Sequence, residues 1–80
     1  MDNTDFEVKK IISEQLGTGF QEISVETLFF NDLGGDSLDM IELVMSIEET
    51  FKIEIKDDEI KNMKTVGDII QCVKKYKIKL

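Results

Sequence analysis

Serine and cysteine are the residue types of this 80-residue chain that most often form covalent bonds to substrates or cofactors. Ser37 lies in the run Gly35-Asp36-Ser37-Leu38-Asp39, and Cys72 is the only cysteine. Either group needs a base to become a nucleophile, and the usual base is histidine. The chain has no histidine. We therefore expect no enzymatic activity of its own, and no catalytic residues.

Acidic residues provide possible metal ligands, but their spacing is wrong for a calcium loop. Residues 31–36 resemble the beginning of a calcium loop. When the loop is numbered from Asp32, however, the position that requires glycine holds Ser37, and the position of the bidentate glutamate holds Leu43. The triplet Asp57, Asp58 and Glu59 is typical of a helix start, where acidic residues complement the helix dipole. We predict no metal site, and weak divalent-cation binding by that triplet stays open.

A helix must position Ser37. Asp36 is a good N-cap and Asp39, three residues later, gives a carboxylate version of the capping box. Ser37 then falls at the first helical position, with its hydroxyl toward solvent and beside unpaired backbone N–H groups. An anion such as a phosphodiester is favoured there. The preceding glycines allow a sharp turn and leave room for an enzyme to reach the hydroxyl. An ordinary surface serine fits the same position, so position alone leaves both interpretations open.

Hydrophobic periodicity predicts an all-α fold: a small bundle of three main helices plus one short helix, with a long loop between the first two helices. Gly17 is a natural stop for the first helix. Thr65, with Asp68 three residues later, indicates the start of the last helix. Apolar and polar residues nowhere alternate over a stretch long enough for a strand. The expected helices cover residues 8–16, 36–51, 57–63 and 65–79, and the long loop covers 18–33. Nothing suggests a second domain, so residues 1–80 are expected to form one.

The net charge of −7 is concentrated in one segment. Between Asp36 and Glu59 there are nine acidic residues and two lysines, which alone give −7, whereas the rest of the chain is balanced. This charge argues against nucleic acid and anionic membranes as partners, because it repels their phosphates. The acidic segment predicts a surface for basic partner proteins, although such a segment can also serve solubility alone.

The lone cysteine excludes an internal disulfide and fits a reducing compartment. No apolar run approaches membrane-spanning length. The acidic residues 1–5 do not resemble a signal peptide. We therefore expect a cytoplasmic protein.

The segment from Asp32 to Asp39, DLGGDSLD, resembles the D-L-G-x-D-S-L-D signature of bacterial-type acyl carrier proteins, in which the serine carries 4′-phosphopantetheine. The likeness continues through residues 42–49, 8–17 and 65–68, so nearly the whole chain is covered. Two positions depart from the family pattern. Lys56 replaces a frequent proline before the short helix, which could loosen the start of that helix, and Gly35 replaces a common alanine.

The resemblance implies that a phosphopantetheinyl transferase (holo-acyl-carrier-protein synthase) attaches the arm to Ser37. The arm then carries growing fatty acyl chains as thioesters between fatty-acid synthesis enzymes, and the carrier is a monomer. The resemblance also implies that the helix after Ser37 docks basic surfaces of those enzymes. The residues expected to dock are Asp36, Leu38, Asp39, Ile41, Glu42, Met45, Glu48 and Glu49.

Related carriers shelter the acyl chain inside the bundle. The candidates to line that space are Phe29, Leu43, Ile47, Ile55, Met63 and Ile69. For Leu38 and Met45, spacing alone fits core packing as well as docking. Three alternatives stay open: a carrier for another cargo (aminoacyl, D-alanyl or polyketide), an acidic helical adaptor that is never modified, and a small calcium sensor, which the loop spacing disfavours.

Overall fold

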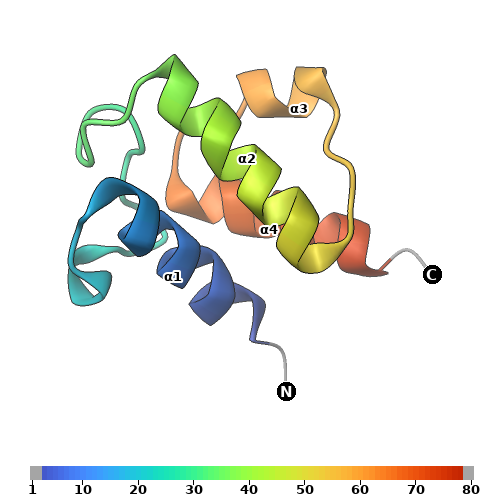
Figure 1. Cartoon of the computed structure of the whole chain (residues 1–80), viewed down its shortest axis with the longest axis horizontal. Helices are drawn as coiled ribbons and strands as arrows, with labels where there is room; N and C mark the ends of the chain where they lie inside the picture. Colours follow the sequence, from blue (N-terminus) through green and yellow to red (C-terminus); the bar gives the residue numbers. More distant parts are fainter. Residues whose placement is uncertain (1–2, 79–80) are drawn as a thin grey trace.

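The computed structural model describes residues 3–78 and consists of three long helices and one short one (Figure 1). They are α1 (Thr4–Leu16), α2 (Ser37–Phe51), α3 (Asp57–Lys61) and α4 (Val66–Ile78), with a 3₁₀ turn, η1 (Phe20–Glu22), after α1. Within residues 3–78 there is no strand, and extended pairing is limited to one isolated bridge between Leu28 and Thr65. The predicted fold class is therefore confirmed.

Local sequence signals set the ends of the long helices. Gly17 ends α1 in the left-handed conformation, with φ of 70°, and its N–H donates to the carbonyl of Ser13 at 2.9 Å. At the start of α4, the Asp68 N–H donates to Thr65 Oγ1 at 3.0 Å, and the Thr65 N–H donates to Asp68 Oδ2 at 3.1 Å. Both signals were predicted. The last helix was predicted to extend to Lys79, which lies outside the described residues.

The long connection between α1 and α2 is tied to the rest of the molecule at several points. The N–H of Phe29 donates to the carbonyl of Lys64, and that of Val66 donates to the carbonyl of Thr27, both at 2.9 Å. Two of its apolar side chains, Ile23 and Phe29, are buried in the core. These contacts fix the segment that leads into α2, as expected of a loop pinned by apolar residues.

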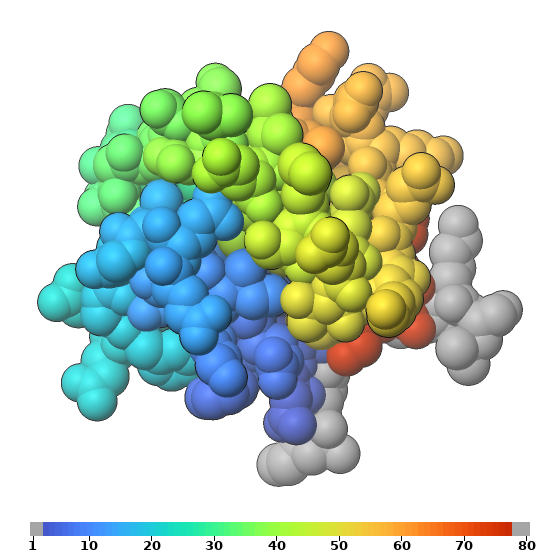
Figure 2. Space-filling view, viewed as in Figure 1, coloured from blue at the N-terminus to red at the C-terminus, as the bar shows by residue number. Residues whose placement is uncertain are grey.

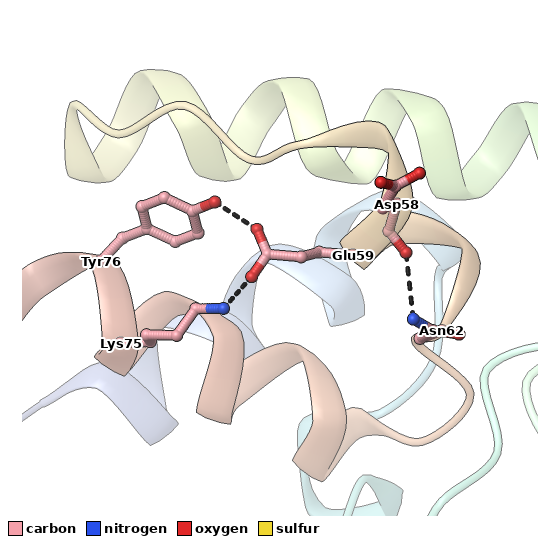
Figure 3. Close-up of polar contacts among 5 residues, drawn as sticks. All are labelled: Asp58, Glu59, Asn62, Lys75 and Tyr76. Atoms are coloured by element: carbon pink, nitrogen blue, oxygen red, sulfur yellow. Dashed lines mark hydrogen bonds and ion pairs between the residues drawn. The ribbon is translucent and has the colours of Figure 1, made fainter.

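The short helix α3 is held to α4 by one carboxylate. Glu59 accepts hydrogen bonds from the ammonium group of Lys75 and the hydroxyl of Tyr76, both on α4 (Figure 3). Asn62, just after α3, donates from its side chain to the carbonyl of Asp58 at 3.1 Å. A helix of five residues is not stable alone, so such contacts decide where it lies.

A single core connects the helices. Its members are buried apolar side chains from all three long helices, the α1–α2 loop and the segments on either side of α3: Val8, Ile12, Ile23, Phe29, Met40, Leu43, Val44, Ile47, Ile55, Met63, Val66, Ile69, Ile70 and Val73. In the space-filling view, the side chains of α2 form a green-to-yellow band between α1, in blue, and α3, in orange (Figure 2). In residues 3–78, we find no helix that is both long enough and apolar enough to span a bilayer.

Candidate functional site

The start of α2 is held by a reciprocal pair of hydrogen bonds. The Asp39 N–H donates to Asp36 Oδ1 at 2.8 Å, and the Asp36 N–H donates to Asp39 Oδ2 at 3.0 Å. Asp36 has extended backbone angles, as an N-cap residue requires. The predicted capping box is therefore confirmed. Both carboxylates have a structural role, and Ser37 is left out of the cap.

Ser37 is the first residue of α2 and is exposed. In residues 3–78 no hydrogen bond from or to its hydroxyl is found. The amides of Ser37 and Leu38 belong to the first turn, where an α-helix provides no acceptor for N–H groups. Oγ is thus accessible, and a negative charge placed on it would lie at the positive end of the 15-residue helix.

The two glycines before Asp36 have different roles. Gly34 has φ of +72°, which allows the turn that we predicted. Gly35 is buried, and a Cβ built on it would lie 2.4 Å from the ring of Phe29. At Gly35 the missing Cβ makes room for the Phe29 ring, and the room that we expected for an enzyme to reach the Ser37 hydroxyl stays a prediction.

The outer face of α2 is partly apolar and partly acidic. Leu38, Ile41 and Met45 are 62%, 51% and 57% exposed, and they do not belong to the core. Glu42 and Glu49 are exposed on the same helix. For Leu38 and Met45, spacing had left core packing and docking open as alternatives. The exposure of both side chains excludes core packing.

Glu48 differs from the other acids that we expected to dock. Its side chain is partly buried, and Oε2 accepts a hydrogen bond from the N–H of Ile55 at 2.8 Å. The carboxylate therefore holds the segment between α2 and α3 against α2. A partner that bound it would compete with this contact.

The six candidates for an acyl pocket meet in the core. None is more than 5% exposed, and all belong to the one cluster of buried side chains: Phe29, Leu43, Ile47, Ile55, Met63 and Ile69. They come from the loop, α2, α4 and the segments beside α3. The structure thus brings together residues that are 40 positions apart in the sequence.

The acidic triplet at the start of α3 does not form a cluster. The hydrogen bonds from Lys75 and Tyr76 occupy the Glu59 carboxylate and hold its pKa below the usual value. Across residues 3–78, no three histidine, cysteine or acidic side chains are placed to share a metal ion.

The sequence did not reveal two features. One is the Glu59–Lys75–Tyr76 contact. The other is a surface hollow of about 240 Å³ beside Ser37, to which Phe30, Ile60 and Lys61 contribute. Both depend on residues from different elements, and no spacing pattern indicates them.

The comparisons with known proteins agree on one family. Residues 7–73 match the model of the phosphopantetheine attachment site. The chain is 47% identical over 76 residues to an acyl carrier protein of Buchnera aphidicola, covering 95% of this chain and 97% of that protein. It is 46% identical over 69 residues to one of Clostridium acetobutylicum, covering 86% and 90%. The crystal structure of an acyl carrier protein from Thermotoga maritima superposes with a TM-score of 0.76 at 37% identity, covering 88% and 81%.

The matched family model covers residues 7–73 and identifies the helical bundle as a phosphopantetheine-carrying domain. The chain belongs to the acyl carrier protein family. Its cofactor is 4′-phosphopantetheine, and its role is that of a non-catalytic carrier in fatty-acid synthesis, in contact with acyl chains and the enzymes that process them.

The residues around Ser37 fit this cofactor. The hydroxyl of Ser37 is exposed at the first position of α2, so a phosphodiester on Oγ would lie at the solvent-exposed positive end of the helix. When attached, the arm supplies a terminal thiol that holds an acyl group as a thioester.

Proposed function

We propose that Ser37 is the residue that carries the 4′-phosphopantetheine arm. The observation that carries this proposal is the exposure of its hydroxyl at the first position of α2, within the matched family region. Asp36 and Asp39 stabilise the helix end, so that the transferase can use Oγ without disrupting the cap. The transferase takes the arm from coenzyme A, and fatty-acid synthesis enzymes then load and modify the acyl group.

The outer face of α2 is the proposed docking surface, which we define as Asp36, Leu38, Asp39, Ile41, Glu42, Met45, Glu48 and Glu49. Charge attraction to Lys and Arg of a partner speeds encounter and is weakened by salt. The exposed apolar side chains of Leu38, Ile41 and Met45 provide contact area between the charges. Glu42 and Glu49 are the acids of this surface that the structure leaves most available, because Asp36, Asp39 and Glu48 hold backbone N–H groups. Docking of this kind is fast and weak, which suits a carrier that must leave each enzyme.

The proposed shelter for the acyl chain is the core around Phe29, Leu43, Ile47, Ile55, Met63 and Ile69. Removing a methylene group from water contributes about 0.8 kcal/mol. The core must open to admit a chain, and the flexible side chain of Met63 favours such a change. If this proposal is correct, the melting temperature of the acylated protein changes with chain length; a melting temperature that is the same for short and long chains would contradict it.

We further propose that residues 1–80 form one domain, that the carrier is monomeric and that it works in the cytoplasm. One continuous core supports the single domain. The unpaired cysteine supports a reducing compartment.

The experiment that tests the attachment site is an intact-mass measurement. The unmodified protein is incubated with coenzyme A, magnesium and a promiscuous phosphopantetheinyl transferase, and Ser37→Ala and Ser46→Ala are treated in parallel. The proposal predicts a gain of one phosphopantetheine on the wild type and on Ser46→Ala, and none on Ser37→Ala. Loading of Ser37→Ala, or no loading of the folded wild type, would overturn it.

A further inference from the structure

The hollow beside Ser37 is mostly apolar. Its walls are Phe30 from the α1–α2 loop, Met40 and Ile41 from α2, and Ile60 and Met63 from α3 and the residues that follow it. Phe30 and Ile41 are 41% and 51% exposed, so the hollow is open to solvent. Figure 1 shows α3 next to the amino-terminal part of α2, which is where the hollow lies. A molecule attached to Ser37 therefore starts at the edge of an apolar surface.

One charged side chain lines this hollow, that of Lys61 at the end of α3. The side chain is exposed, and in residues 3–78 no carboxylate lies within ion-pair distance of it. Asp57 and Asp58, which are one turn away on the same short helix, do not pair with it. Among residues 3–78, Lys61 is thus a lysine without an ion pair in the wall of a hollow that Ser37 also lines.

A second hollow, of about 310 Å³, continues the first. Phe30, Lys61 and Met63 line both, and Leu28, Asn31 and Lys64 complete the second. Because they share three lining residues, the two hollows are neighbours, and we refer to them together as the trough, which extends from Ser37 to Lys64 in the α3–α4 connection. The trough combines apolar walls, one side-chain amide and two lysines. Those are the groups that suit a ligand with an anionic end, aliphatic carbons and amide bonds.

We propose that Lys61 is a positioning residue for the phosphopantetheine arm: its ammonium group pairs with the phosphodiester on Ser37 and directs the arm into the trough past Phe30 and Met63. This inference rests on the proposed attachment to Ser37. Pairing of a phosphate with a lysine at a partly apolar surface is stronger than in open solvent, because fewer waters screen the charges. An arm held in this way keeps its thioester close to the bundle between encounters with enzymes.

The test uses the loaded protein and nuclear Overhauser effects (NOEs) between the arm and the protein. Wild type, Lys61→Gln, Lys61→Arg and the control Lys10→Gln are each loaded, and intact mass confirms one arm per chain. Lys10 is an exposed lysine of α1 that lines neither hollow. We expect NOEs from the methyl groups of the arm to Phe30 and Met63 in the wild type. They should fall at least twofold in Lys61→Gln and at high salt, and persist in Lys61→Arg and Lys10→Gln.

The possible outcomes separate this inference from the proposed function. Loading without these NOEs in the wild type, or NOEs that are unchanged in Lys61→Gln, would overturn the role of Lys61 and leave the attachment site intact. A merely structural role of Lys61 at the end of α3 would shift the amide resonances of α3 in the unloaded variant without weakening the arm contacts, which would also overturn it. Absence of loading on Ser37 would overturn both proposals.

Discussion

The α-carbon of Gly35 lies against the ring of Phe29 so closely that a Cβ would come within 2.4 Å of it. The two residues are also joined through the backbone, where the Gly35 N–H donates to the Phe29 carbonyl at 3.1 Å. Phe29 is completely buried, so its ring has little freedom to move away. This contact connects the core directly to the residue that precedes the capping box of Ser37.

Replacing Gly35 by alanine should therefore lower the stability of the protein. Overpacking a filled core costs about 1–3 kcal/mol, and the thermal unfolding midpoint measures the loss. The matched control is Gly19→Ala, because a Cβ at Gly19 meets only the flexible side chain of Glu22, at 3.8 Å. Equal midpoints for Gly35→Ala and the wild type would show that the loop relaxes around the extra methyl group.

The capping box predicts a difference between two substitutions of Asp36. Asp36→Ala removes the acceptor for the Asp39 N–H and should cost about 0.5–2 kcal/mol. Asp36→Asn keeps an acceptor and removes the charge, so its stability should stay close to that of the wild type. Urea unfolding of both variants measures this. If Asp36→Asn and Asp36→Ala destabilised the protein equally, the charge of Asp36, rather than its hydrogen bond to the Asp39 N–H, would be the source of the stabilisation.

The contact of Glu59 with α4 predicts a pH-dependent contribution to stability. The hydrogen bonds from Lys75 and Tyr76 lower the pKa of Glu59 in the folded protein below its ordinary value of 4.5. A lowered carboxyl pKa stabilises the fold above the unfolded pKa, and this contribution is lost as the pH falls through the folded pKa. Glu59→Gln should thus be less stable than the wild type at pH 7, and the difference should shrink in acid. A difference that stays constant from neutral to acidic pH would contradict the assignment.

Glu42→Lys tests the docking surface. Glu42 is exposed on α2, so reversing its charge should leave the fold intact. The apparent KM of a fatty-acid synthesis enzyme for the loaded carrier should rise about fivefold or more at low salt, which corresponds to roughly 1 kcal/mol. Glu26→Lys, an equal change at an exposed loop position, is the control. The two variants should converge at high salt, whereas identical KM values at low salt would remove Glu42 from the docking surface.

The sequence alone was sufficient to predict the features that depend on neighbouring residues in the chain. Gly17, Asp36 with Asp39, and Thr65 with Asp68 each mark a helix end, and each forms the predicted hydrogen bonds. For Leu38 and Met45, spacing alone left core packing and docking open, and the structure shows that both side chains are exposed.

The remaining features depend on contacts between distant segments. Glu48 was expected on the docking surface, yet its carboxylate holds the N–H of Ile55. Lys61 is part of no motif in the sequence, and only the packing of α3 beside α2 places it in the same hollow as Ser37. No periodicity or motif carries such information, because it arises from tertiary packing.

The central claim is that Ser37 Oγ holds the arm, and fragment-ion mass spectrometry of the loaded wild-type protein tests it most directly. We expect the added phosphopantetheine on Ser37, within the segment 32–39, and on none of Ser13, Ser24 and Ser46. An arm on any of those three serines, or on Cys72, would contradict the account.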